Sequence, residues 1–474
     1  MKKTLTALLL VFALLFACGC SGGGKKNENE NQGDGEKPAL TPVDELPSFT
    51  DDGSYEFWIA GWNGPSTSEY DKAFKVMADA GFNHMPLSSS LMSSGTMVNY
   101  LDYAEKYGIK VYPQMMGRVT VPPEEYFVNV FDDYLDHKGL GGFYYFDEPA
   151  SGLYDKFTVL AKNHAEKYSP HGLDFIINLY GITYYDDPSL DNRSSSYLEY
   201  VMQYCNAVFP YVDGLKFLSV DHYPLCYTGS ADNISGYYLE PEWLITCETV
   251  AECAKSWDAF PHFFLLSTGH YNKYRDATEE RLRYQANVYM AYGARGLSHF
   301  TSHGNKDADP NSNRFNVDSM ISADGCTTRP TYEYAKKVNL EILSWDHVFL
   351  RYDWQGVQYV LGEGNDGNTL FSKTQFGLAS LPGVEFLSST EDLIVGHFTD
   401  ENSQPAYMVT NFVDPDVGTQ DDTATVNMVI TDANRAIVYR NGVPETVEVK
   451  DGALTLEVGV GEAAFVIPVN LKNG

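Results

Sequence analysis

The sequence is poor in basic residues. Its 474 residues include 33 Lys and Arg against 64 Asp and Glu, which gives a formal net charge of −31 at pH 7. Such a surface repels nucleic acid phosphates and anionic lipid head groups. We therefore expect the folded body to bind no nucleic acid and no anionic membrane surface. The charge suits an exported protein that acts on a neutral ligand.

Cysteine is also scarce, and its spacing is not that of a structural zinc site. There are 7 cysteines, and no CxxC pair is matched by a second pair. Cys247 and Cys253 are close enough in the chain for a local disulfide, which the sequence leaves open. We expect no metal and no other cofactor.

The apolar run near the N-terminus, Leu8 to Phe16, is too short to span a bilayer. It lies between a basic start and a Cys-containing segment of small residues, so residues 1–20 are typical of a signal peptide. This segment resembles a bacterial lipobox, with Cys18 slightly favoured over Cys20 as the lipidated residue. We expect a protein exported and lipid-anchored to the bacterial cell envelope, at the cell surface. An ordinary secreted signal peptide is the alternative.

Residues 21–50 contain almost nothing apolar before Leu40. This composition predicts a flexible polar tether, with a reach on the order of 30 Å if it behaves as a coil.

Residues 51–352 alternate short apolar runs with amphipathic stretches, and no repeat of roughly 20 to 50 residues is present. The pattern predicts eight strands, the number that a closed parallel barrel needs. They are Glu56–Gly61, Asn83–Leu87, Lys110–Gln114, Gly142–Asp147, Asp174–Leu179, Lys216–Asp221, His262–Ser267 and Gly296–Thr301. The expected fold class is α/β, a (β/α)8 TIM barrel with a C-terminal all-β sandwich-like domain.

Helix signals separate these strands. Ser68, with Asp71, is expected to cap one helix, and Asp276, with Glu279, another. Three glycines stand where a helix should end before the next strand, namely Gly81, Gly108 and Gly293. In residues 353–474 helix periodicity gives way to period-two alternation with turn signals such as Asn441-Gly442, which predicts the all-β accessory domain.

The segment Phe143 to Pro149 is an aromatic strand that ends in two adjacent carboxylates, Asp147 and Glu148. Burying both inside a sheet would be costly, so the strand is expected to deliver them to its C-terminal rim, where barrel enzymes place catalytic groups. The alternative is that Asp147 caps the helix that begins near Ala150.

Other chemistry-bearing residues also follow the predicted strands. In chain order they are Trp62, Asn63, Ser88 to Ser90, Gln114, Asn178, Tyr180, Asp221, His222, Tyr223, His270, Tyr271, Ser302 and His303. Carbohydrates need aromatic faces for their C–H groups and polar groups for their hydroxyls. The residues expected to shape a carbohydrate site are Trp62, Asn63, Gln114, Tyr145, Asp147, Asn178, His222, Tyr223, His270, Tyr271 and His303. A lone Trp or His at a strand end is more often structural, so this expectation depends on their convergence.

Glycoside hydrolysis requires two carboxyl groups that flank the scissile bond. Glu148 is the better candidate for the acid, because burial among aromatic rings would raise its pKa. Asp221 is the best second carboxylate, since its strand lies near that of Glu148 in a closed barrel. That Asp221 merely holds His222 or a loop amide is the alternative.

The chain resembles the β-galactosidase-like (β/α)8 glycoside hydrolases and their bacterial lipoprotein relatives. The matching segments are Tyr145–Pro149, Ile177–Leu179, Ser219–Pro224, Ser267–Tyr271, Arg283–Ala286 and Ala291–Gly296. The resemblance implies that Glu148 is the acid/base and that Asp147 replaces an asparagine that binds the substrate 2-hydroxyl. Retaining members place a glutamate at the end of strand seven, where this chain has Ser267-Thr-Gly-His270.

The leading hypothesis is thus a cell-surface glycoside hydrolase with Glu148 as acid and Asp221 as nucleophile or base. The missing strand-seven glutamate motivates the alternative, a non-catalytic glycan-binding lipoprotein, of which a solute-binding lipoprotein is a variant. A metal-dependent hydrolase using Asp221, His222, His270 and His303 is a third hypothesis, although strand one lacks a His-x-His pair.

Overall fold

The computed structural model describes residues 40–65, 67–87, 94–115, 129–185, 187, 189–230, 233–268, 273–304 and 319–472. An eight-stranded parallel sheet is ordered β4-β3-β2-β11-β10-β7-β6-β5. Its strands are β2 (Trp58–Gly61), β3 (His84–Leu87), β4 (Lys110–Pro113), β5 (Gly142–Asp147), β6 (Asp174–Tyr180), β7 (Phe217–Asp221), β10 (Phe260–Leu266) and β11 (Gly296–Phe300). All eight predicted strands are confirmed, with ends that differ by at most two residues.

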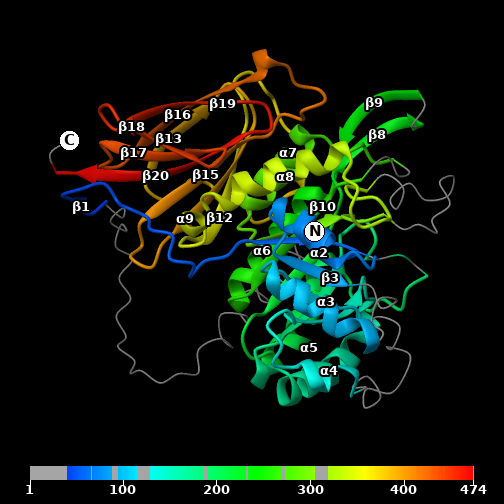
Figure 1. Ribbon diagram of the computed structural model, residues 1–474. Coiled ribbons are helices and arrows are strands. Elements are labelled where there is room, and N and C mark those ends of the chain that lie inside the picture. Colours follow the sequence, from blue (N-terminus) through cyan, green and yellow to red (C-terminus); the bar gives the residue numbers. More distant parts are fainter. Residues whose placement is uncertain are drawn as a thin grey trace, which may run out of the picture. The chain divides into compact units, whose positions relative to one another are not determined.

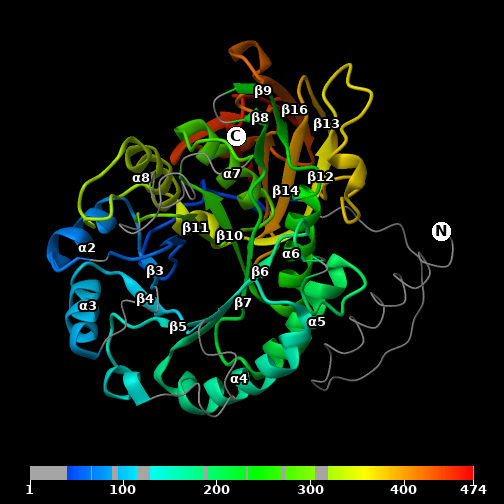
Figure 2. The same cartoon turned by 90° about the vertical axis from the view of Figure 1, so that its right-hand side faces the viewer.

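The two edge strands of this sheet, β4 and β5, meet through isolated parallel bridges, Val111 with Leu140 and Gln114 with Tyr144. The Met115 amide also donates to the Tyr144 carbonyl at 2.7 Å. The sheet is therefore a nearly closed barrel, which Figure 2 shows as a ring of strands inside a ring of helices.

The helices follow the strands as expected for repeated strand–helix units. They are α2 (Tyr70–Asp79), α3 (Ser94–Lys106), α4 (Tyr154–Lys167), α5 (Tyr197–Val208), α6 (Trp243–Trp257), α7 (Glu279–Ala291), α8 (Pro330–Leu343) and α9 (Asp346–Phe349). A 3-10 turn, Asn129–Tyr134, precedes β5, and another, Ser151–Leu153, precedes α4. None of the helices in the described ranges combines the length and apolar character that a bilayer crossing requires.

Both predicted helix caps are wrong in detail. Helix α2 is preceded by Glu69, which makes no side-chain capping bond, and α7 is capped by the Thr278 hydroxyl, which accepts from the Arg281 amide. The glycine predictions are confirmed, because Gly81, Gly108 and Gly293 all adopt positive φ angles. These helix ends need the left-handed backbone that only glycine adopts without strain.

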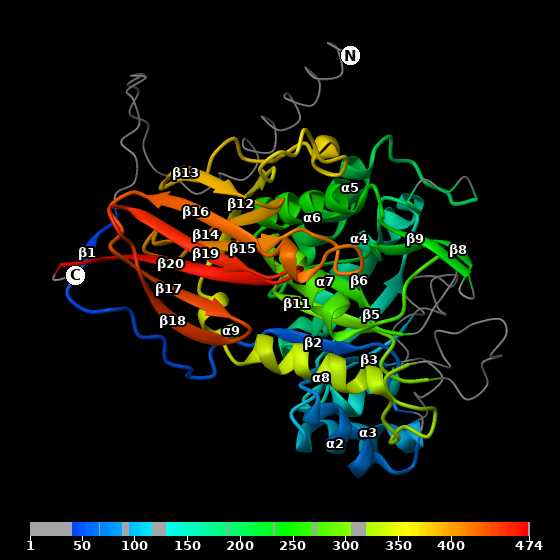
Figure 3. The same cartoon turned by 90° about the horizontal axis from the view of Figure 1, so that it is seen from above.

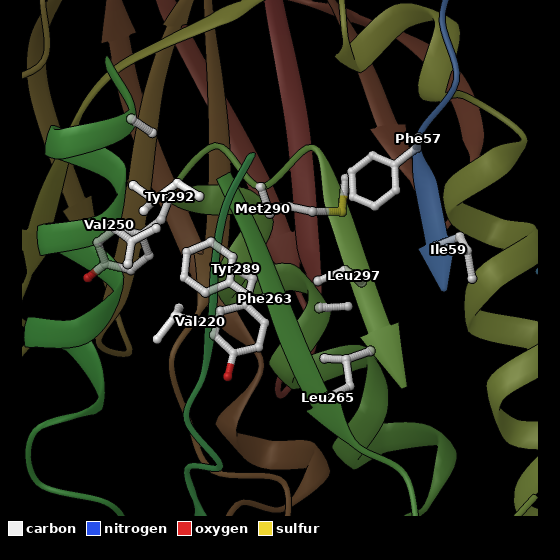
Figure 4. Close-up of a cluster of buried hydrophobic side chains, with 14 of the residues drawn as sticks. Phe57, Ile59, Val220, Val250, Phe263, Leu265, Tyr289, Met290, Tyr292 and Leu297 are labelled. Atoms are coloured by element: carbon white, nitrogen blue, oxygen red, sulfur yellow. The ribbon is translucent and has the colours of Figure 1, made fainter. Parts of the chain in front are cut away.

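Outward-facing strand residues and the helices form the main core of the barrel (Figure 4). Phe263 of β10 stacks on Tyr289 of α7 with ring centroids 4.6 Å apart. Helix α7 is buried along most of its length, and Leu282, Ala286 and Tyr289 are among its buried residues. Removing a ring such as that of Phe263 from this layer would cost about 3–5 kcal/mol.

The C-terminal region is all β, as predicted. One sheet holds β12 (Asp353–Val360), β14 (Leu393–Thr399), β15 (Pro405–Asn411), β20 (Ala463–Leu471), β17 (Arg435–Arg440) and β18 (Val443–Glu448), with β1 (Pro42–Val43) paired to β20. A second sheet holds β13 (Val384–Ser389), β16 (Ala424–Ile430) and β19 (Ala453–Val458). Figure 3 shows the two sheets, between which a second apolar core is enclosed.

The central strands of the larger sheet are buried on both faces. Val395 and Val409 face the second sheet, whereas Phe398 and Met408 belong to the barrel core. The strands β14 and β15 both contact α7. Residues Ala39 to Gly474 accordingly form one compact unit.

A feature that we did not predict is a two-stranded antiparallel hairpin after β7. It consists of β8 (Leu225–Ser230) and β9 (Asn233–Leu239) and projects from the barrel in Figure 1. Lys273 to Arg275 run alongside β8, because the Tyr227 amide donates to the Lys273 carbonyl and the Arg275 amide to the Leu225 carbonyl.

The five cysteines of the described ranges are buried free thiols. Cys247 and Cys253 both lie on α6. Six residues of helix separate their Cα atoms by about 9 Å, which is too far for a disulfide.

Candidate active site

The C-terminal end of β5 holds two carboxylates through a β-bulge. The register between β5 and β6 shifts between Tyr144 and Phe146. Tyr145 and Phe146 consequently both belong to the outer core, while Tyr144 and Asp147 face inward, where the Tyr144 hydroxyl donates to Asp147 Oδ1 at 2.8 Å. Asp147 accepts hydrogen bonds here and does not cap a helix, since Ala150 precedes the next turn.

Glu148 follows in the left-handed region, at φ 51°, and its amide donates to the Asn178 carbonyl. A non-glycine residue in this region costs on the order of 1 kcal/mol or more, and such residues cluster at functional sites. The turn directs Glu148 toward Asp221 of β7, with which it hydrogen-bonds.

Asn178 of β6 connects the acidic residues. Its Nδ2 donates to Asp147 Oδ1 at 3.2 Å and to Asp221 Oδ1 at 2.9 Å. The orientation of this amide is fixed from behind, because its Oδ1 accepts from the Ser219 hydroxyl at 2.6 Å. One amide group therefore holds two carboxylates from neighbouring strands.

The bonds continue through the barrel interior. Ser219 gives its only hydrogen to Asn178, so it accepts from Nδ1 of His262, 2.9 Å away. Nε2 of His262 then accepts from the Ser298 hydroxyl at 2.9 Å. Burial lowers the pKa of His262 to about 3, which keeps the ring neutral. Four adjacent strands, β6, β7, β10 and β11, are thus linked from within.

The three carboxyl groups are each partly buried in the wall of the barrel. Burial raises the pKa of Glu148 to about 7, and the charge of Asp147 adds to the shift. Burial, together with the charges of Glu148 and Asp147, raises the pKa of Asp221 well above its usual range. Burial also raises the pKa of Asp147, but the bonds from Tyr144 and Asn178 oppose that shift. Near neutral pH the Glu148–Asp221 pair therefore retains a proton, while Asp147 is the best stabilised carboxylate.

These groups open onto one cavity of about 450 Å³. Its lining residues are Trp62, Asp147, Glu148, Asn178, Tyr180, Tyr184, Asp221, Tyr223, Phe264, Tyr274 and Phe300. The cavity is within the size range of small-ligand sites, and its aromatic walls surround a few polar groups. The arrangement offers a proton donor and a carboxylate to a ligand that stacks on aromatic rings.

Six of the predicted site residues meet in this cavity, namely Trp62, Asp147, Glu148, Asn178, Asp221 and Tyr223. Five others do not line it. Tyr145 bonds His164 in the outer core, and His222 bonds Thr246 of α6, because each points to the outside of its strand. Gln114 is buried, the Asn63 carbonyl accepts from Ser302, and His303 is buried beside Ser302. His270, Tyr271, Cys18 and Cys20 lie outside the described residues.

Five aromatic residues of the lining were not assigned to binding from the sequence. They are Tyr180, Tyr184, Phe264, Tyr274 and Phe300. Tyr180 and Phe300 are the last residues of β6 and β11. Strand-end position was therefore an available signal, and it had already marked Tyr180 as a rim residue. Tyr184 and Tyr274 lie in loops, and their hydroxyls approach within 3.0 Å. Nothing in the local sequence marks that contact.

Metal ligation finds no support in the described ranges, where no group of three or more His, Cys, Asp or Glu side chains is arranged to hold an ion. The ring nitrogens of His222 bond Thr246 and Thr183, and Nδ1 of His303 bonds Ser302.

Comparison with known proteins gives a fold-level result. No protein-family model matches the sequence, and no curated protein matches it. A solved structure described as a glycoside hydrolase matches with a TM-score of 0.54 and 11% identity, over 90% of this chain and 94% of that chain. A GH27 β-L-arabinopyranosidase from Geobacillus stearothermophilus matches with a TM-score of 0.47 and 11% identity, over 87% and 96% of the two chains. The α-galactosidase I of Mortierella vinacea matches with a TM-score of 0.47 and 9% identity, over 89% and 99%. The match to the first of these structures shows that this chain shares the fold of a solved glycoside hydrolase, as the resemblance in its sequence implied.

Proposed function

We propose that the protein is a glycoside hydrolase that acts on a glycan or oligosaccharide, with Glu148 and Asp221 as its catalytic carboxyl groups. The observation that carries this proposal is the convergence of Glu148 and Asp221 on the wall of one aromatic cavity. In the proposed reaction Glu148 protonates the glycosidic oxygen as the bond to the anomeric carbon breaks. Its pKa of about 7 suits a general acid near neutral pH.

The two carboxyl groups are close enough for each to shift the pKa of the other, which favours a retaining reaction. An inverting enzyme separates its two carboxyl groups by about 6.5–9.5 Å to admit a water molecule, and a retaining enzyme by about 5 Å. Asp221, ionised once the shared proton lies on Glu148, would attack the anomeric carbon and form a covalent glycosyl ester as the bond to the leaving oxygen breaks. Glu148 would then take a proton from the water that hydrolyses this ester.

The first test measures hydrolysis by Glu148→Gln and Asp221→Asn. Both variants are expected to lose about 100-fold or more in kcat on natural glycans. On an aryl glycoside with an acidic phenol leaving group, Glu148→Gln should retain much of its kcat/KM, because departure needs no proton, while its kcat stays low because the ester is hydrolysed without a base. Asp221→Asn should stay inactive. NMR of the first-formed anomer reports retention.

Glu333→Gln, which changes an exposed carboxyl on α8, serves as the control and should behave as wild type. Equal turnover by wild type and Glu148→Gln on every substrate would remove Glu148 from the reaction.

A second candidate is a glycan-binding protein without catalysis. The observation that favours it is the end of β10, where Leu266 is followed by Ser267 and Thr268 and no carboxylate is offered. Calorimetric binding of an oligosaccharide that the protein never cleaves would support this candidate over hydrolysis.

We also propose that the protein is exported and lipid-anchored to the bacterial cell envelope through Cys18 or Cys20. The support is the basic, apolar and small-residue pattern of residues 1–20, followed by the polar segment 21–50.

A further inference from the structure

One wall of the cavity is tied to the C-terminal β region by a buried ion cluster. The Arg275 cluster consists of Arg275 and Arg281 from the barrel and Asp414 and Asp416 from the loop after β15. The side chain of Arg275 is 1% exposed, and those of Asp414 and Asp416 are 10% and 15% exposed. Buried pairs of this kind are geometrically demanding, because each unmatched charge is costly.

Every donor of the Arg275 guanidinium has an acceptor. Nη1 donates to Asp414 Oδ1 and Asp416 Oδ2, each at 2.6 Å, and Nη2 donates to Asp414 Oδ2 at 2.7 Å. Nε donates to the Cys226 carbonyl and Nη2 to the Tyr238 carbonyl, at 2.7 and 2.8 Å. The guanidinium thereby fixes both strands of the β8–β9 hairpin to the β region.

Arg275 directly follows Tyr274, which lines the cavity. Tyr274 is 6% exposed, forms a bridge with Cys226 of β8, and packs its ring edge-on against Tyr223 with centroids 5.6 Å apart. Its hydroxyl approaches that of Tyr184. Tyr274 thus connects two other cavity-lining tyrosines.

We propose that Asp414 and Asp416 are positioning residues for the sugar site: they hold Arg275, and through it the Tyr274 ring, against the cavity. The inference rests on the proposed function, since it assigns Tyr274 to a carbohydrate-binding wall. The C-terminal β region accordingly contributes to substrate binding from outside the cavity.

The test is a double-mutant cycle between Asp414→Ala and Tyr274→Ala. Asp414→Ala is expected to raise KM, or the Kd of a bound oligosaccharide, about tenfold while changing kcat much less. In the Tyr274→Ala background the same change should have little further effect on KM or Kd, because the ring that Asp414 positions is gone. Additive effects would overturn the proposal.

Glu341→Ala is the matched control. Glu341 of α8 binds Arg283 through both carboxylate oxygens in a comparably buried pair, 20% and 11% exposed, and neither residue lines the cavity. It should lower thermal stability as Asp414→Ala does, yet leave KM and Kd unchanged. An equal rise of KM in both variants would reduce the role of Asp414 to general stability.

Amide hydrogen exchange separates failure of this inference from failure of the proposed function. Asp414→Ala should speed exchange at the amides of Tyr227 and Arg275, which bond across β8. If exchange becomes faster but the protein neither binds nor hydrolyses carbohydrate, Asp414 positions Tyr274 as inferred and the proposed function is wrong. Unchanged exchange would reject the positioning itself.

Discussion

At the scale of single residues, the site depends on hydrogen-bond donors and protons that are shared among three carboxyl groups. Asp147, Glu148 and Asp221 come from two strands and bring three acidic groups to one buried place. A single amide, that of Asn178, donates to two of them, and a proton between the other pair removes one charge. Such a cluster is stable only when it is partly protonated, which ties its function to pH.

The pH dependence of hydrolysis follows from the Glu148–Asp221 pair. The raised pKa of Glu148, about 7, means that its acid form is present below this pH and is lost above it. We expect kcat/KM to fall about tenfold per pH unit on the alkaline side. The measurement is kcat/KM on one glycoside across the pH range, with Glu148→Gln as the comparison.

Glu148→Gln should remove this alkaline limb and leave only a small, flatter activity. A wild-type profile without a decline on the alkaline side would contradict the assignment of Glu148 as the acid.

At the scale of elements, strands were predictable where aromatic runs ended in turn residues, and side-chain directions were predictable only where the ladder is regular. The bulge between Tyr144 and Phe146 shows why. Strict alternation would have turned Asp147 and Tyr144 to opposite faces, but the extra residue puts both inside and sends Tyr145 to the outer core. A bulge depends on the neighbouring strand, which the local sequence does not contain.

The β8–β9 hairpin and the loop tyrosines escaped prediction for the same reason. Their positions depend on Arg275 and on Asp414, residues 139 apart in the chain. Position near a strand end was enough to predict that Trp62, Asn178 and Tyr223 line the cavity. His222 is the residue after Asp221, so its side chain points to the opposite face and bonds Thr246 of α6.

Helix α7 and strand β14 meet at a point where no side chain fits. A Cβ at Gly396 would lie 2.2 Å from the Ala291 carbonyl oxygen. Gly396→Ala should therefore force the helix and the sheet apart and lower the free energy of unfolding by about 1–3 kcal/mol, measured by denaturant titration.

Gly367→Ala provides the comparison, since its Cβ would meet no atom within 4 Å. It should leave stability nearly unchanged. A Gly396→Ala variant as stable as wild type would mean that the two elements can separate without cost.

At the scale of the whole molecule, barrel and β region share one core. Phe398 and Met408 of the β sheet belong to the same buried cluster as Tyr289 of α7. A sheet whose central strands are buried on both faces cannot be removed without exposing barrel surface, so the β region is integral to the fold.

Lipid attachment is testable on the whole protein in its host. Mass spectrometry of the mature N-terminus should find an acylated cysteine, at Cys18 in preference to Cys20. Cys18→Ser should release the protein from the membrane fraction, with Cys20→Ser as the companion variant. A mature chain that begins after both cysteines and carries no lipid would instead indicate ordinary secretion.

Strand β1 lies beside the end of β20, where Pro42 and Val43 pair with Asn470 and Leu471. A pull applied to the chain before residue 40 would thus load the β region at this two-residue ladder. The barrel would feel the pull only after the ladder had sheared. If the chain is anchored as we propose, this ladder would take the load before the cavity does.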